Sequence, residues 1–108
     1  MSTPRDLLRE GARLFDGGHP WHAHEVWETA WRADRSPHRD AWKGLIQLAA
    51  AVHHLRRGNP GPVPVLLARA KTHWQAHGHH LAAHPAAVTA ALARVEQTGV
   101  VPVLAPLL

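Results

Sequence analysis

The sequence has no cysteine among its 108 residues and no long apolar run. Without cysteine the chain has no disulfide, no thiolate metal site and no cysteine nucleophile, so a bound metal would need histidine and carboxylate ligands. No stretch approaches the roughly 18 apolar residues that span a bilayer. The segment from Met1 to Asp6 lacks the apolar core of a secretory signal. We therefore expect a cytoplasmic protein with no membrane partner.

A strong charge of one sign is also missing, because 12 basic residues against 8 acidic ones leave a formal net charge of only +4. This surplus is spread along the chain, whereas nucleic-acid-binding domains usually concentrate it in one stripe. Nucleic acid is therefore not an expected partner. Arg5, Arg9 and Arg13 do form a basic edge on the first predicted helix. We interpret this edge as a solvated face, with contact to an anion or to RNA as the alternative.

The pattern of the chain is helical throughout. A composition of 45% hydrophobic and 19% charged residues is that of a globular domain. No alternating run predicts a strand, and proline and glycine mark the ends of helical stretches. The expected fold class is all-α, a compact bundle of about five helices in a single domain over residues 1–108. The predicted helices run from Pro4 to Gly17, from Pro20 to Ala33, from Ser36–Pro37 to Arg57, from Val63 to Leu81 with a weak point at Gly78, and from Pro85 to Gly99.

The third predicted helix and the C-terminal segment define the expected core. Apolar residues cover most of the circumference of the third helix, so we expect it at the centre of the bundle. Residues 100–108 are too broken by proline for a helix and too apolar to remain in water. This extended apolar tail is expected to pack across the bundle or onto a second copy. A homodimer formed through the tail or through helix faces is accordingly the expected partner.

The second predicted helix carries the most informative cluster. His24 and Glu28 lie four residues apart, next to an apolar arc that includes Trp27 and Trp31. At this spacing an imidazole and a carboxylate stack on one helical face, close enough to share a proton or a metal ion. Glu25 points further toward solvent. The pair is the candidate site of the second helix.

The third helix offers a matching polar stripe, because Gln47 and His54 are seven residues apart on an otherwise apolar surface. An unpaired buried amide or imidazole costs on the order of 1 to 3 kcal/mol, so these side chains need partners. We expect the stripe to meet His24 and Glu28.

Two interpretations of this pocket stay open. In the functional one, Glu28 and one or both histidines bind a divalent metal such as Zn²⁺, with His24, Glu28 and His54 as ligands, or act as an acid/base pair while Gln47 orients a ligand. In the other interpretation, these polar side chains form a structural hydrogen-bond network that fixes the register of the helices. The His-Glu-x-x-His motif of zinc proteases is absent, because Glu28 occupies the place of its second histidine.

Histidine and tryptophan are the two abundant unusual residues, with 11 and 5 copies. A row of histidines in and after the fourth predicted helix has the three- and four-residue spacing of helical metal ligands. No carboxylate accompanies this second histidine stripe, and glycine and proline interrupt it. We interpret these histidines as surface residues without a specific metal-binding role. They are His73, His77, His80 and His84. Four tryptophans lie on apolar faces, and we interpret them as core residues: Trp27, Trp31, Trp42 and Trp74.

Several short segments resemble those of a family catalogued as domain of unknown function 309. They are residues 14–17, the Ala-His-Glu-Val-Trp-Glu run at 23–28, residues 31–32, the Gly-Leu-Ile-Gln run at 44–50 and residues 54–59. The resemblance covers about residues 14 to 75 and implies a helical bundle with no assigned activity. Its motif singles out His24, Glu25, Glu28, Trp31, Gln47, His54, Gly58 and Asn59, which adds Glu25 and Trp31 to the pocket. The sequence departs from the pattern after Asn59, where Pro60–Pro64 delays the fourth helix.

The leading hypothesis is thus a helical bundle with a polar His/Glu/Gln pocket that binds a metal ion or a small ligand. The first alternative is a non-catalytic interaction or homodimerisation module in which the polar network is structural. The second is a metal-dependent hydrolase.

Overall fold

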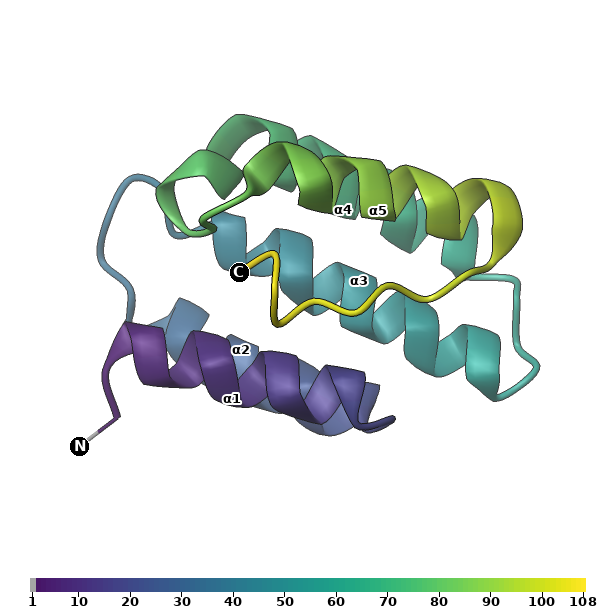
Figure 1. Ribbon diagram of the computed structural model, residues 1–108, viewed down its shortest axis with the longest axis horizontal. Helices are drawn as coiled ribbons and strands as arrows, with labels where there is room; N and C mark the ends of the chain where they lie inside the picture. Colours follow the sequence, from purple (N-terminus) through teal and green to yellow (C-terminus); the bar gives the residue numbers. More distant parts are fainter. Residues whose placement is uncertain (1) are drawn as a thin grey trace.

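The computed structural model of this chain describes residues 2–108 and confirms an all-helical fold (Figure 1). Within these residues there are five α helices, one short 3₁₀ helix and no strand. In chain order the elements are α1 Pro4–Asp16, α2 Pro20–Ala33, α3 Ala41–Arg56, α4 Val63–His77, η1 Gly78–His80 and α5 Pro85–Thr98.

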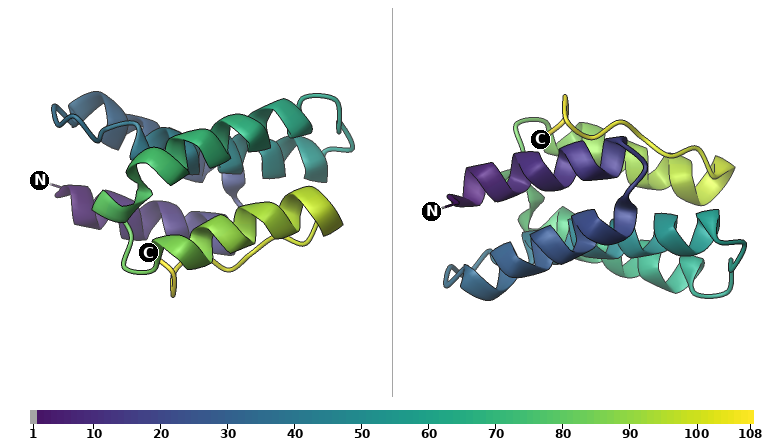
Figure 2. Two further views of the ribbon diagram at one scale, coloured as in Figure 1. Left: turned by 90° about the horizontal axis from the view of Figure 1, so that it is seen from above. Right: turned by 90° about the horizontal axis from the view of Figure 1, so that it is seen from below.

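The helices pack in the order of the chain. α1 lies on α2, α3 packs between α2 and α4, and α5 lies on α4 (Figures 1 and 2). Nine of the 16 residues of α3 are buried, so the expectation of a central third helix is confirmed. On the side of α2, Lys43 and Gln47 of α3 face a groove between the two helices.

Proline and capping residues set most helix starts as predicted. Thr3 caps α1, where its hydroxyl accepts from the Asp6 backbone N–H at 3.1 Å and the Asp6 carboxylate accepts from the Thr3 N–H at 3.0 Å. This reciprocal capping box satisfies two backbone donors that a helix start leaves unpaired. Gly99, in the left-handed conformation with φ of 71°, ends α5.

The predicted start of the third helix at Ser36–Pro37 is wrong, because α3 begins at Ala41. Asp34 holds the preceding segment in a turn. One carboxylate oxygen accepts from the Ser36 N–H at 2.8 Å, and the other accepts from the Trp42 indole N–H at 3.0 Å. An Asx-type turn of this kind competes with helix formation at a serine-proline pair.

The fourth helix also ends earlier than predicted, at His77 instead of Leu81. A Cβ at Gly78 would lie 2.4 Å from Cε2 of Trp74, so the indole occupies the space beside this glycine. The chain then tightens into η1. The weak point predicted at Gly78 is therefore the end of the helix.

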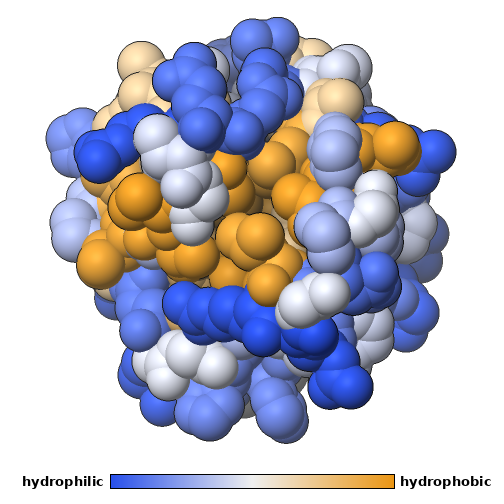
Figure 3. Space-filling model, turned by 90° about the vertical axis from the view of Figure 1, so that its right-hand side faces the viewer, coloured by the Kyte–Doolittle hydropathy of each residue, from blue (hydrophilic) through white to orange (hydrophobic). Residues whose placement is uncertain are grey.

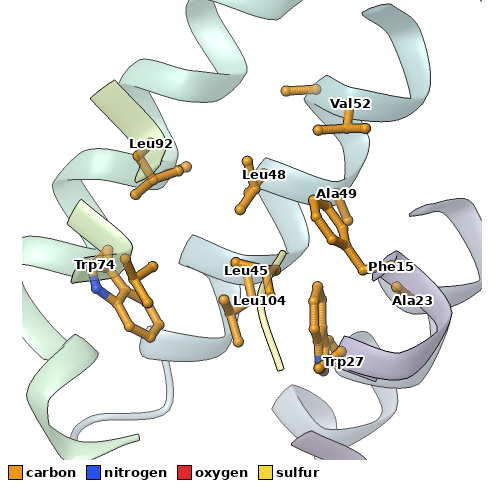
Figure 4. Packing of buried hydrophobic residues seen from close by; sticks show 14 of the residues in the cluster. Phe15, Ala23, Trp27, Leu45, Leu48, Ala49, Val52, Trp74, Leu92 and Leu104 are labelled. Carbon is orange, nitrogen blue, oxygen red and sulfur yellow. The ribbon is translucent and has the colours of Figure 1, made fainter. Parts of the chain in front are cut away.

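Three buried tryptophans anchor the core, and each indole N–H has an acceptor. Figure 4 shows two of them, Trp27 and Trp74, among the buried apolar residues. Trp27 donates to the Leu8 carbonyl at 3.3 Å, Trp74 donates to the Pro85 carbonyl at 3.0 Å, and Trp42 donates to Asp34. Gly11 lets the Trp27 indole lie directly against α1, since a Cβ there would come within 2.1 Å of its Nε1. Each tryptophan thus buries a large apolar surface without losing a hydrogen bond.

Residues 99–104 have no helix and run back over the bundle, with Leu104 fully buried in the core (Figures 1 and 4). The Asp16 carboxylate at the end of α1 accepts from the backbone N–H groups of Leu104 and Ala105 at 2.7 and 3.0 Å. These bonds join segments that are 88 and 89 residues apart in sequence.

The surface retains some apolar area. Figure 3 shows it as an orange region at the end of the molecule where α5 passes into the C-terminal segment. Val100, which follows that helix, is 51% exposed. A homodimer through this part of the chain stays a prediction. Over residues 2–108, no helix combines the length and apolarity required to cross a bilayer.

Candidate functional site

The candidate site is a polar groove between α2 and α3, and its first part is the His24–Glu28 pair. Nε2 of His24 lies 3.6 Å from Oε2 of Glu28, as the four-residue spacing predicts. Arg32, one turn further on, forms an ion pair with the other Glu28 oxygen. The side chains of His24 and Glu28 are 17% and 31% exposed, so both reach the edge of the groove without being sealed inside it.

Gln47 of α3 lies across the groove from Glu28. Both line a hollow of about 220 Å³, together with Trp31, Lys43 and Ile46. Within the described chain, Oε1 of Gln47 and Nδ1 of His24 are buried and have no hydrogen-bond partner. Leaving such an atom unpaired costs about 1–3 kcal/mol. Of the two residues, Gln47 lines the hollow and His24 does not.

Trp31 forms one rim of the hollow. Its indole N–H donates to Asp40 at 3.1 Å. The guanidinium carbon of Arg39 lies 4.1 Å from the ring centroid, and Nζ of Lys43 lies 4.7 Å from it. Trp31 therefore packs against the core, and cations lie over its ring in cation–π contacts.

The other end of the groove holds two aromatic residues that were not predicted as part of the site, Trp21 and His53. The Trp21 ring stacks on His24 with 4.5 Å between centroids and 9° between planes, and lies 4.9 Å from the His53 ring. Burial, followed by the nearby Arg57 charge, lowers the pKa of His53. The spacing of Trp21 and His24, three residues apart on one helix, was the available signal for their contact.

His54 and Glu25 do not join the groove. His54 lies in the last turn of α3, where its Nδ1 is 3.4 Å from the Asn59 amide nitrogen, and it does not line the hollow. Glu25 is exposed. Among residues 2–108, no three histidine, aspartate or glutamate side chains are arranged to hold a metal ion. His54 thus does not complete a three-ligand set with His24 and Glu28.

The second histidine stripe is rearranged by the end of α4 at His77. His38, from the loop after α2, stacks on His80 with 3.3 Å between ring centroids, and its Nδ1 lies 3.5 Å from Nδ1 of His77. His79 lies beside His80, with 3.9 Å between centroids. Burial and then the neighbouring histidines lower the pKa of His80. The cluster thus gains His38, which no spacing along a single helix could have indicated.

Comparison with known proteins agrees with the motifs of α2 and α3. The family model described as Domain of unknown function (DUF309) matches residues 8–63, which is more than half of the chain. An uncharacterized protein of Aquifex aeolicus is 31% identical over 61 residues, which cover 56% of this chain and 18% of that protein. The chain therefore spans less than a fifth of this relative. No solved structure matches the present chain. On the extent of the family match, this chain belongs to the DUF309 family.

Proposed function

We propose that this chain is a ligand-binding module whose site is the groove between α2 and α3. The observation that carries the proposal is the buried, unpartnered Oε1 of Gln47, a residue that lines this groove. Native structures leave few buried polar atoms without a partner, and a bound molecule is one of the reasons for an exception. A ligand that donates to the Gln47 oxygen would remove the cost of leaving that atom unpaired.

The chemistry of the walls favours a small zwitterion. The hollow is lined by one carboxylate residue, Glu28, one ammonium residue, Lys43, and one amide residue, Gln47. Trp31 and Ile46 supply apolar surface. The volume of about 220 Å³ suits a molecule smaller than the drug-sized ligands that occupy pockets of roughly 300–1,000 Å³. A free amino acid with a small side chain carries the complementary charges at this size.

The position of the domain in its relative also supports a binding role. The matched region is 18% of the Aquifex aeolicus protein, so a similar sequence occurs within a longer chain. A compact domain that recognises a ligand can serve in such different contexts without carrying the chemistry itself.

NMR titration with L-alanine tests the proposal. The expected result is saturable shifts of the Gln47 side-chain amide and of Lys43, much weaker shifts with propionate or ethylamine, and loss of the response in Glu28→Gln and Gln47→Met. Gln75→Met, on the exposed surface of α4, is the matched control and should respond like wild type. Equal responses to all three probes, or a response retained in both groove variants, would count against this site.

A divalent cation is the second candidate ligand. Two ligand atoms of one Zn²⁺ lie about 3.3 Å apart in tetrahedral geometry, close to the 3.6 Å between His24 Nε2 and Glu28 Oε2. Titration of tag-free protein with Zn²⁺, Mn²⁺ and Ni²⁺ should then give binding that is lost in both His24→Ala and Glu28→Ala. Binding lost only in His38→Ala would place the metal at the separate histidine cluster instead.

A further inference from the structure

A second hollow differs from the α2–α3 groove in its lining and in its chemistry. It has a volume of about 590 Å³, within the range of roughly 300–1,000 Å³ that is typical of ligand pockets. It lies between α1, the segment that joins α4 to α5 and the end of the C-terminal segment, which Figure 1 shows meeting on one side of the bundle. It shares no lining residue with the α2–α3 groove.

The floor of this α1 groove is apolar. Leu8 and Ala12 contribute the inner face of α1, and Leu81 contributes the segment after η1. Leu108 closes the groove from the C-terminal segment, where its carbonyl accepts from the Ala83 N–H at 3.4 Å. An apolar chain placed here would remove this partly exposed surface from water.

The rim of the α1 groove is basic. Arg5, Arg9 and Arg13 follow one another at intervals of four residues and all line it, and His79 and His80 line the opposite side. Among residues 2–108, no aspartate or glutamate lines the groove. Like charges four residues apart repel one another along a helix, so an anion placed between them would relieve that repulsion.

None of the three carboxylates of α1, Asp6, Glu10 and Asp16, lines the groove. Asp6 is engaged in the helix cap, where its hydrogen bonds with Thr3 and then the Arg9 charge lower its pKa. Asp16 accepts from the backbone of the C-terminal segment, and Glu10 is exposed to solvent. Within residues 2–108, none of the three arginines forms an ion pair. Their guanidinium groups therefore remain available for a carboxylate, which they can bind through paired hydrogen bonds.

We infer that the α1 groove binds an amphipathic organic anion, with its acid group at Arg5, Arg9 and Arg13 and its alkyl chain against Leu8, Leu81 and Leu108. The arginine edge then has a ligand-binding role in addition to contact with solvent. The same face does not suit nucleic acid, because an apolar floor offers nothing to a hydrated sugar-phosphate backbone.

Calorimetric titration of the full chain with decanoate, below the concentration at which it aggregates, tests the inference. We expect one saturable site. Removing one guanidinium in Arg9→Gln should weaken binding about tenfold, the equivalent of one charge-assisted hydrogen bond. The triple change of Arg5, Arg9 and Arg13 to Gln should abolish binding at the same concentrations. All three side chains are exposed, so helical circular dichroism should be unchanged in these variants.

Two controls test the location of the site and the need for a charged ligand. Arg94 lines a different apolar hollow beside α5, so Arg94→Gln should bind decanoate like wild type. Decanol, which has the chain without the charge, should bind much more weakly than decanoate. Equal affinity for decanol, wild-type affinity in the triple variant, or binding to phosphatidylglycerol vesicles without binding to monomeric decanoate would each overturn the inference. The alanine response of the α2–α3 groove should be unaffected by the triple change.

Discussion

Replacing Gln47 by methionine should make the protein more stable. The two side chains have similar length and volume, so the packing around Ile46 and Trp31 can be kept. The substitution removes an amide whose Oε1 is buried without a partner. Such an atom costs about 1–3 kcal/mol, and since Gln47 is only partly buried we expect a gain near the lower end, about 1 kcal/mol.

Urea denaturation followed by tryptophan fluorescence measures this gain directly, and calorimetry measures it as a shift of Tm. For a domain of this size, 1 kcal/mol corresponds to roughly 4 °C. Gln75→Met on the exposed face of α4 should change the free energy of unfolding by less than about 0.5 kcal/mol.

A loss of stability in Gln47→Met would contradict this expectation. If the substitution lowers the free energy of unfolding by about 1 kcal/mol or more, the amide contributes a favourable contact in the folded state, on the scale of one hydrogen bond. The network would then be structural, which is the alternative interpretation of the polar residues. A gain in stability accompanied by loss of ligand binding is the combination expected of a functional residue.

Three further predictions concern the fold. Gly11→Ala should destabilise the protein by about 1–3 kcal/mol in urea denaturation, because its Cβ would collide with the Trp27 indole, whereas Gly61→Ala, which meets nothing within 4 Å, should be close to neutral or slightly stabilising. Asp16→Asn leaves one acceptor oxygen for two backbone N–H groups, so it removes one hydrogen bond to the C-terminal segment and weakens the other. It should speed hydrogen exchange at residues 104 and 105 relative to the core of α3; unchanged exchange would show that packing alone holds the segment. Burial lowers the pKa of His73 below its ordinary 6.5, so the unfolded chain binds the proton more readily and the stability contributed by this group is lost as pH falls below 6.5. The urea midpoint should fall less with decreasing pH in His73→Gln than in wild type.

The sequence was most informative about local structure. Proline at the starts of α1, α2 and α5 and glycine after α1 and α5 placed these helices correctly, because such residues act on the backbone of their own turn. The predicted start of α3 was too early because Asp34 binds both Ser36 and the side chain of Trp42. The bond from Trp42 comes from the following helix, so the residues of the turn alone do not indicate it.

The candidate site was predictable along one helix and less so between helices. The contact of His24 with Glu28 follows from helical geometry alone. Which residue of α3 meets which residue of α2 depends on the crossing of the two helices, and the crossing puts His53, not His54, beside Trp21. The α1 groove could not be predicted from the sequence either, because its walls come from three segments that are far apart along the chain: residues 4–13, 79–83 and 105–108.

The burial of Leu104 has a consequence for how the protein is made. The interior of the bundle has a place that only this side chain fills, and Asp16, near the opposite end of the sequence, fixes the backbone on both sides of that place. During synthesis the five helices have all left the ribosome before the residue that seals them emerges. Until Leu104 emerges, the growing chain therefore exposes the apolar surface that this side chain covers in the folded domain. Partial products should be recognised by chaperones or degraded far more readily than the finished domain.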